Sequence, residues 1–279
     1  MNKDEFQKAS RNVWEKMARG WDDNREYMWD TSKPVGMWLV EKLEPRVGQT
    51  LLELAAGMGD TGFVAAKLVG PSGRLISTDF APEMVKRAER WAAELGVTNA
   101  EFRVLDAENM DLESDSVDGV LCRWGYMLMS DPAAALRETR RVLRPGGRLT
   151  FSVFAGPDQN PWAALPAKAL VDEGLMRAPA PGSPGIMALG SKERLKSLVE
   201  DAAFSECIIE EVPITWRYKK FEEYWRFLTE VAGAIAALIE ALPSEKQSTA
   251  RDAIRHAISN FETGPGIALP GVTLNVAAR

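Results

Sequence analysis

The chain has 279 residues, of which 46% are hydrophobic, an ordinary share for a globular protein that argues against disorder. Its formal net charge of −6 provides no basic field that would attract nucleic acid or an anionic membrane surface. One histidine and two cysteines, without metal-ligand or disulfide spacing, argue against zinc sites, Ser-His-Asp chemistry and a disulfide framework.

These numbers lead us to expect no bound metal and no nucleic-acid partner. The first residues lack the apolar core of a signal peptide. No apolar run approaches the roughly 18 residues that a membrane span needs. The sequence therefore predicts a cytoplasmic protein without a membrane span.

Residues 1–34 are expected to form a helical lid segment ahead of the main fold. Residues 4–18 place apolar side chains near one face of a helix, the spacing of a docking helix. The following stretch, 20–29, is dense in aromatic and charged residues and predicts no particular element. Pro34 is expected to open a further helix, which Pro45 closes.

Residues 35–155 show the alternation of strands and helices expected of an α/β core. Strands are predicted at about 50–55, 74–78, 100–105, 117–122 and 148–154. Helices between them are predicted near 61–69, 82–95 and 132–143. Apolar strands separated by helices predict a parallel sheet that is covered on both faces.

The second half of the chain is expected to leave this sheet and return to it. The predicted segments are an irregular proline-rich insertion (156–190), a helix and strand of the core (191–218), a helical lid insertion (219–264) and a closing strand (265–279). Within them, helices are expected at 162–176, 191–202, 221–242 and 244–261, and a strand at 206–216. His256 falls outside the apolar stripe of its helix and is expected at the surface.

The stretch 50–63 predicts a ligand site. A short apolar strand is followed by a turn through Gly57, Gly59 and Gly62 and then by a helix-like run. Glycine permits such a turn and lets backbone approach a nucleotide-like ligand, because a Cβ would block the approach. The start of the helix offers free N–H groups to negative charge.

Three carboxylates occupy corresponding places at the ends of successive strands: Glu53, Asp79 and Asp106. In a parallel sheet these ends line one edge, where ligands bind in doubly wound folds. Asp79 suits the two hydroxyls of a ribose, and Asp106 an exocyclic amine such as adenine N6. Glu53 is a candidate to meet a cationic amine through a water or a backbone group.

A second interpretation of the glycine turn is a dinucleotide site, because residues 57–62 also fit the pattern G-x-G-x-x-G. A pyrophosphate rarely tolerates nearby acids, yet Glu53 and Asp60 flank the turn. Asp106 has no role in a dinucleotide site. The combination favours a ligand with ribose and adenine but without phosphates.

Four stretches carry a further resemblance: ELAAGMG at 53–59, DFAPEM at 79–84, DA at 106–107 and VLRPGGRL at 142–149. As a set they are highly specific. They resemble the motifs of class I S-adenosylmethionine-dependent methyltransferases, especially the ubiquinone/menaquinone-biosynthesis-like small-molecule branch. The resemblance covers about residues 35–155.

This resemblance implies S-adenosylmethionine as cofactor, bound by Glu53, Ala55, Gly57, Gly59, Asp79, Phe80, Met84, Asp106, Ala107 and Arg123. It also implies an α/β fold, a doubly wound, Rossmann-like sheet of seven strands with an antiparallel last strand, plus a helical lid. The closing strand, about 272–278, is expected to insert antiparallel beside the 206–216 strand. Ala55 stands where the family usually has glycine and is expected to crowd the turn slightly, without preventing cofactor binding.

The resemblance also places the segment 122–127 where the methionine end of the cofactor meets the acceptor pocket. Trp124 and Tyr126 are expected to stack an acceptor or to face the sulfonium, with packing in the core as the alternative. Cys122 is expected to be a buried structural thiol.

Two aromatic residues of the N-terminal lid, Trp21 and Tyr27, are further candidate contacts of the acceptor. Tyr27 and Asp22 are also candidate acid/base groups.

The expected function is transfer of a methyl group from S-adenosylmethionine to a small-molecule acceptor by in-line displacement. We assign no catalytic residue, because an already nucleophilic acceptor needs orientation more than a general base. Two alternatives stay open at this point: a nicotinamide-dependent oxidoreductase and a non-catalytic S-adenosylmethionine-binding protein.

Overall fold

The computed structural model describes residues 3–180 and 182–279. Met1 and Asn2, within the predicted segment 1–34, and Pro181, within the predicted insertion 156–190, lie outside the described residues.

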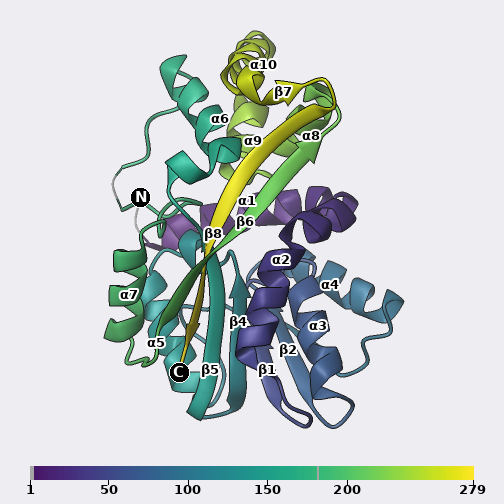
Figure 1. Ribbon diagram of the computed structural model, residues 1–279, viewed down its shortest axis with the longest axis vertical. Helices are drawn as coiled ribbons and strands as arrows, with labels where there is room; N and C mark the ends of the chain where they lie inside the picture. Colours follow the sequence, from purple (N-terminus) through teal and green to yellow (C-terminus); the bar gives the residue numbers. More distant parts are fainter. Residues whose placement is uncertain (1–2, 181) are drawn as a thin grey trace.

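One mixed sheet organises the molecule (Figure 1). Its strands are β1 (Thr50–Glu53), β2 (Arg74–Asp79), β3 (Ala100–Val104), β4 (Val117–Arg123), β5 (Leu143–Phe154), β6 (Ile208–Tyr218), β7 (Glu262–Thr263) and β8 (Gly266–Ala278). The order across the sheet is β3-β2-β1-β4-β5-β8-β6, and the two-residue β7 pairs with β8. Strands β1 to β5 pair in parallel, whereas β8 runs antiparallel to both β5 and β6.

The predicted fold class, an α/β doubly wound sheet with an antiparallel last strand and helices on both faces, is confirmed. Leu51 and Leu52 show why both faces are covered, since adjacent residues of a strand point to opposite sides. Leu51 is buried in a cluster that includes Val40 and Phe63, whereas Leu52 belongs to a second cluster with Leu136 and others.

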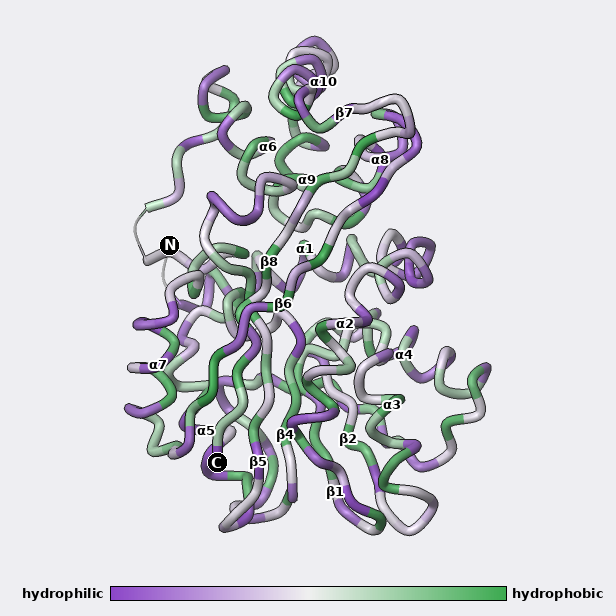
Figure 2. Tube along the Cα trace, in the orientation of Figure 1, coloured by the Kyte–Doolittle hydropathy of each residue, from purple (hydrophilic) through white to green (hydrophobic). Residues whose placement is uncertain are grey.

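The helices that cover the sheet lie on its two faces. They are α2 (Arg25–Leu43), α3 (Asp60–Val69) and α4 (Pro82–Glu94) on one face, and α5 (Pro132–Val142) and α7 (Lys192–Asp201) on the other. In Figure 2 hydrophobic residues gather along the strands between these layers.

The N-terminal region differs from its prediction at Pro34. Helix α1 (Lys3–Asp23) is followed after Asn24 by α2, so the stretch 20–29 is helical and Pro34 lies inside α2. Proline in a helix interior is costly. Burial of Val35 and Leu39, each 0% exposed, outweighs this local preference. The expected boundary between lid and core, at residue 34, therefore falls within a continuous helix.

A long ribbon of β6 and β8 extends beyond the sheet. Its pairing runs from Ile208–Ala277 to Tyr218–Ile267, whereas β5 pairs with β8 only as far as Thr273. The free half of the ribbon leads to a group of helices above the carboxyl ends of β1 to β4 (Figure 1). We call these helices the cap: α6 (Pro161–Asp172), α8 (Phe221–Val231), α9 (Ala234–Ala241) and α10 (Ser244–Ile258).

Two predicted elements have other bounds. The expected helix 221–242 is divided into α8 and α9, because Gly233 adopts φ +49°, with Trp14 packed 3.6 Å from where its Cβ would lie. The closing strand begins at Gly266 rather than 272, since it continues along β6 into the cap.

Candidate functional site

The glycine turn after β1 is held by buried carboxylates. Glu53 accepts the backbone N–H of Gly62 at 2.8 Å and the Ser77 hydroxyl at 3.3 Å. A Cβ at position 62 would lie 2.1 Å from a Glu53 carboxylate oxygen, so glycine is required there. Burial raises the pKa of Glu53 to about 8. Glu53 thus holds the turn from its buried side.

Asp79 ends β2 and faces the turn. Its two oxygens accept the backbone N–H groups of Gly57 and Ala81, each at 3.0 Å. Burial, the largest cause, raises the pKa of Asp79 to about 6, although these N–H groups favour its ionised form. The N–H groups of Gly57 and Gly62, which a pyrophosphate would need, are thus already bound to carboxylates.

Asp106 lies on the loop that joins β3 to β4. It accepts the backbone N–H of Glu108 at 2.9 Å and the side-chain N–H of Gln7, on α1, at 3.2 Å. Glu108 accepts the Ser130 hydroxyl at 2.7 Å and pairs with Lys3, also on α1, at 2.8 Å.

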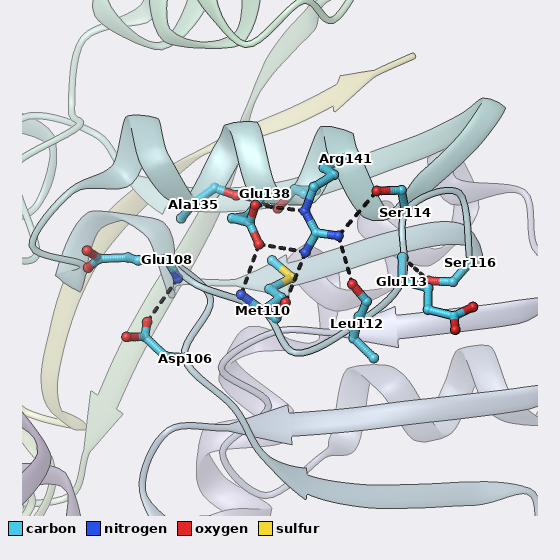
Figure 3. A network of polar contacts seen from close by, with 11 residues as sticks. Asp106, Glu108, Met110, Leu112, Glu113, Ser114, Ser116, Ala135, Glu138 and Arg141 are labelled. Atoms are coloured by element: carbon cyan, nitrogen blue, oxygen red, sulfur yellow. Dashed lines mark hydrogen bonds and ion pairs between the residues drawn. The ribbon is translucent and has the colours of Figure 1, made fainter.

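Arg141 of α5 holds the far part of the same loop (Figure 3). Its guanidinium donates to the carbonyl oxygens of Met110 and Leu112 at 2.9 and 2.7 Å. Glu138 accepts from Arg141 at 2.7 Å and from the Met110 N–H at 2.9 Å. The loop that carries Asp106 is therefore tied to the body of the fold on both sides.

A cavity of about 840 Å³ opens at this edge of the sheet and continues under the cap. At one end lie the glycine turn, Asp79 and Asp106. The other end is formed mainly by apolar and aromatic side chains, among them Phe154, Trp162 and Ile235. A concave site with a few polar groups and a large apolar part is typical of small-molecule binding.

Ten of the predicted site residues line this cavity: Ala55, Gly57, Asp79, Phe80, Met84, Asp106, Ala107, Arg123, Trp21 and Trp124. Arg123 ends β4 and donates through Nε to the Thr61 hydroxyl at 3.1 Å. Its Nη1 is buried without a partner among the described residues. Trp124 stacks on Phe154, with the ring centroids 4.6 Å apart.

Four predicted site residues are not among those that line the cavity: Glu53, Gly59, Tyr27 and Tyr126. Gly59, with φ +84°, shapes the start of α3. The Tyr27 hydroxyl accepts the Arg217 N–H at 3.1 Å. Tyr126 is fully buried, with its hydroxyl 2.6 Å from that of Thr139.

The other candidates also have structural partners. Asp22, outside the cavity lining, pairs with Arg87 and Arg90 of α4 and accepts the Trp91 indole N–H at 2.7 Å. Cys122 is 0% exposed, and burial raises the pKa of its thiol to about 12, in keeping with a structural role.

Sequence reasoning missed the contribution of α1. Phe6, Gln7, Ser10 and Trp14 line the cavity from this helix. Residues 6, 10 and 14 recur at helical spacing, a signal that was visible but indicated only a docking face. It also missed Met129, Met176 and Met187, for which local sequence gives no signal. Met127, which lines the cavity too, lies within the predicted segment 122–127.

Two absences concern only the described part of the chain. It contains no group of three or more His, Cys, Asp or Glu side chains placed to hold a metal ion. None of its helices combines the length and the hydropathy that crossing a membrane requires.

Comparisons with known proteins agree with this geometry. Ubiquinone/menaquinone biosynthesis C-methyltransferase UbiE of Hahella chejuensis is 30% identical over 178 residues, 60% of this chain and 72% of that protein. Nocamycin O-methyltransferase of Saccharothrix syringae is 32% identical over 160 residues, 56% of this chain and 57% of that protein. The chain spans 72% of the length of the Hahella chejuensis protein, but only 37% and 27% of the length of two other curated relatives that it matches.

A solved structure has the same fold: phosphoethanolamine N-methyltransferase 2 of Haemonchus contortus in complex with S-adenosyl-L-methionine. Its TM-score is 0.54 at 14% identity, with 87% of this chain and 51% of that chain covered. A family model described as a methyltransferase domain matches residues 45–214, more than half of the chain. Together with the four motifs, this match confirms the predicted family: the chain belongs to the class I S-adenosylmethionine-dependent methyltransferases.

Proposed function

We propose that this protein transfers a methyl group from S-adenosylmethionine to a small, largely apolar acceptor. The observation that carries the proposal is a single cavity that joins two strand-end carboxylates, Asp79 and Asp106, to an apolar compartment under the cap. Membership of this family excludes the alternative of a nicotinamide-dependent oxidoreductase. The N–H groups of the glycine turn support this exclusion, because they are already bound to carboxylates.

The polar end of the cavity fits the cofactor. Each Asp79 oxygen accepts one backbone N–H and keeps a lone pair free, which suits the two ribose hydroxyls. Asp106 suits the adenine amine, and Phe80 and Met84, which line the same cavity, suit the apolar faces of the ring. Arg123, with its unpartnered Nη1, suits the carboxylate of the methionine end.

When bound, S-adenosylmethionine supplies an electrophilic methyl group on a sulfonium. The task of the protein is then to hold an acceptor in line and away from water. Trp124, Phe154 and Trp216 provide an aromatic wall for this, with Trp124 6.3 Å from Trp216 between ring centroids. These rings give a flat apolar acceptor a surface on which to stack.

The acceptor is proposed to bring its own nucleophile. Ionisable side chains among the described lining residues are Asp79, Asp106, Glu108, Arg123 and Arg194. The two aspartates are assigned to the cofactor, Glu108 is paired with Lys3, and Arg194 is exposed on α7. An acidic enol or phenol needs no protein base, whereas a cationic amine would have to lose a proton first.

The experiment that tests the proposal is calorimetric titration with S-adenosylhomocysteine, with NAD as a control ligand. Asp79→Ala is expected to abolish micromolar binding, while Glu89→Ala, at an exposed acid on α4, leaves it unchanged. Preference for NAD, or no binding by the wild-type chain, would overturn the assignment.

Turnover is tested separately by a panel of apolar phenols and enols, with cationic amines alongside. Methylation of a phenol or enol supports the proposal. Cofactor binding without turnover of any acceptor would favour the non-catalytic alternative. The acceptor class, the absence of a nucleic-acid partner and the cytoplasmic location all remain parts of this proposal.

A further inference from the structure

The N-terminal helix brings an amide to the adenine end of the cavity. Gln7 of α1 lines the cavity next to Asp106 and Ala107. Its Nε2 donates to a carboxylate oxygen of Asp106 at 3.2 Å. The other oxygen of Asp106 accepts the Glu108 N–H, visible in Figure 3. Gln7 is thus the side chain of α1 bonded to the carboxylate that suits the adenine amine.

The contact with Asp106 sets the orientation of this amide. Because a carboxylate only accepts, Nε2 must face Asp106, and Oε1 then points away from that bond. Oε1 has no donor among the described residues. The ion pair of Lys3 with Glu108, at 2.8 Å, holds α1 on the same loop one helical turn earlier. Gln7 and Asp106 both line the cavity, so each of these side chains offers an acceptor to a ligand at this end.

We propose that Gln7 reads the amino edge of the adenine ring. This inference rests on the proposed function. The two hydrogens of the N6 amine go to different acceptors, one to Asp106 and the other to Gln7 Oε1. Glutamine amides are a recurring partner of the adenine edge elsewhere. A ring with an oxo group at this position would set an acceptor against two acceptors, so the pair selects an amino purine.

The proposal also gives α1 a direct part in cofactor binding. Phe6, Ser10 and Trp14 line the same cavity, so the helix closes over the ligand while Gln7 contacts it. Recognition of the base then depends on α1 being seated, which couples the position of this helix to occupancy of the cofactor site.

The test compares S-adenosylhomocysteine with S-inosylhomocysteine, in which an oxo group replaces the amine and N1 carries a hydrogen. Dissociation constants of both are measured by calorimetry for the wild type, Gln7→Met and Lys3→Ala. We expect the wild type to prefer the amino compound, and Gln7→Met to lower this preference roughly five- to tenfold, the factor for one hydrogen bond. Lys3→Ala, which loosens α1 but keeps the Gln7 side chain, should weaken both ligands and lower the ratio less than Gln7→Met does.

Each other outcome has a definite meaning. An unchanged ratio in Gln7→Met, with both affinities lowered together, would assign Gln7 a merely structural role and overturn this inference alone. A wild type that binds neither compound would refute the proposed function itself, and the inference with it.

Discussion

Ionisation of Asp79 is expected to make the affinity for the ligand depend on pH. Burial raises the pKa of Asp79 to about 6, and in the proposed binding mode the ionised carboxylate accepts hydrogen bonds from both ribose hydroxyls. Ligand donors favour the charged form, so affinity should be full above pH 7 and fall as the pH drops through 6. We expect affinity for S-adenosylhomocysteine to decrease by up to about tenfold per pH unit below 6. Calorimetry between pH 5 and 8 measures this.

A matched variant separates Asp79 from other titrating groups, since the pKa of Glu53 is also raised, to about 8. Asp79→Asn keeps the size of the side chain but cannot ionise. It should bind more weakly and show no fall between pH 7 and 5. The same fall in the variant would assign the pH dependence to another group.

Ala55 occupies a left-handed conformation, φ +50°, that favours glycine. Space for its Cβ exists because residue 125 is glycine: a Cβ there would lie 2.7 Å from the Ala55 Cβ and 2.5 Å from the Cys122 sulfur. Gly125→Ala should therefore destabilise the protein by about 1–3 kcal/mol. Ala55→Gly should stay within about 1 kcal/mol of the wild type.

The coupling of these two positions is measured by denaturant unfolding of both single variants and the double variant. Ala55→Gly should recover part of the loss caused by Gly125→Ala, because it removes one of the two close contacts. Strict additivity would show that the two residues do not compensate each other.

At the scale of elements, Arg141 connects α5 to the loop that carries Asp106. Arg141→Met retains the packing of the alkyl stem but removes the bonds to the Met110 and Leu112 carbonyls. We expect a loss of about 1–3 kcal/mol in the free energy of unfolding. Affinity for S-adenosylhomocysteine should fall roughly three- to tenfold, because Asp106 is less well fixed.

The neighbouring Arg140→Met is the control. Arg140 lies on the same helix, but its long hydrogen bond, 3.4 Å, goes to the carbonyl of Leu143, the first residue of β5. It should leave affinity for S-adenosylhomocysteine unchanged. Equal effects of the two variants would show that loss of charge on α5, and not release of the loop, lowers the affinity.

At the scale of the whole molecule, the sheet edge and α1 form the end of the cavity proposed for the cofactor, and the cap closes the other end. Ala167 lines the cavity from α6 and is only half-buried, so a larger side chain would extend into the cavity. Ala167→Trp should lower turnover of any acceptor by more than about tenfold, while affinity for S-adenosylhomocysteine stays within about twofold.

Lys168→Trp, at the exposed next position, controls for adding a tryptophan to α6. It should retain turnover. If Ala167→Trp weakened the cofactor and spared the acceptor, the two ends of the cavity would have to be exchanged in our assignment.

Particular residues show how far sequence reasoning reached. That Asp79 and Asp106 both line one cavity could be predicted, because a strand-end carboxylate is defined by its own strand and parallel strands bring their ends to one edge. Gln7 was missed because its partner lies 99 residues away. Trp124 and Tyr126 were predicted together, yet only Trp124 lines the cavity, since Tyr126 is directed to Thr139 in the core.

The sequence by itself determined the family, the parallel core and the glycine turn with its acids, because each depends on conformations and spacings within a few residues. Tertiary structure decided where the β6–β8 ribbon leaves the sheet, that Pro34 stays within α2, and which face of α1 covers the cavity. These features follow from burial between segments far apart in the chain. Burial of this kind outweighs local preference, and it has no counterpart in the pattern of any single stretch.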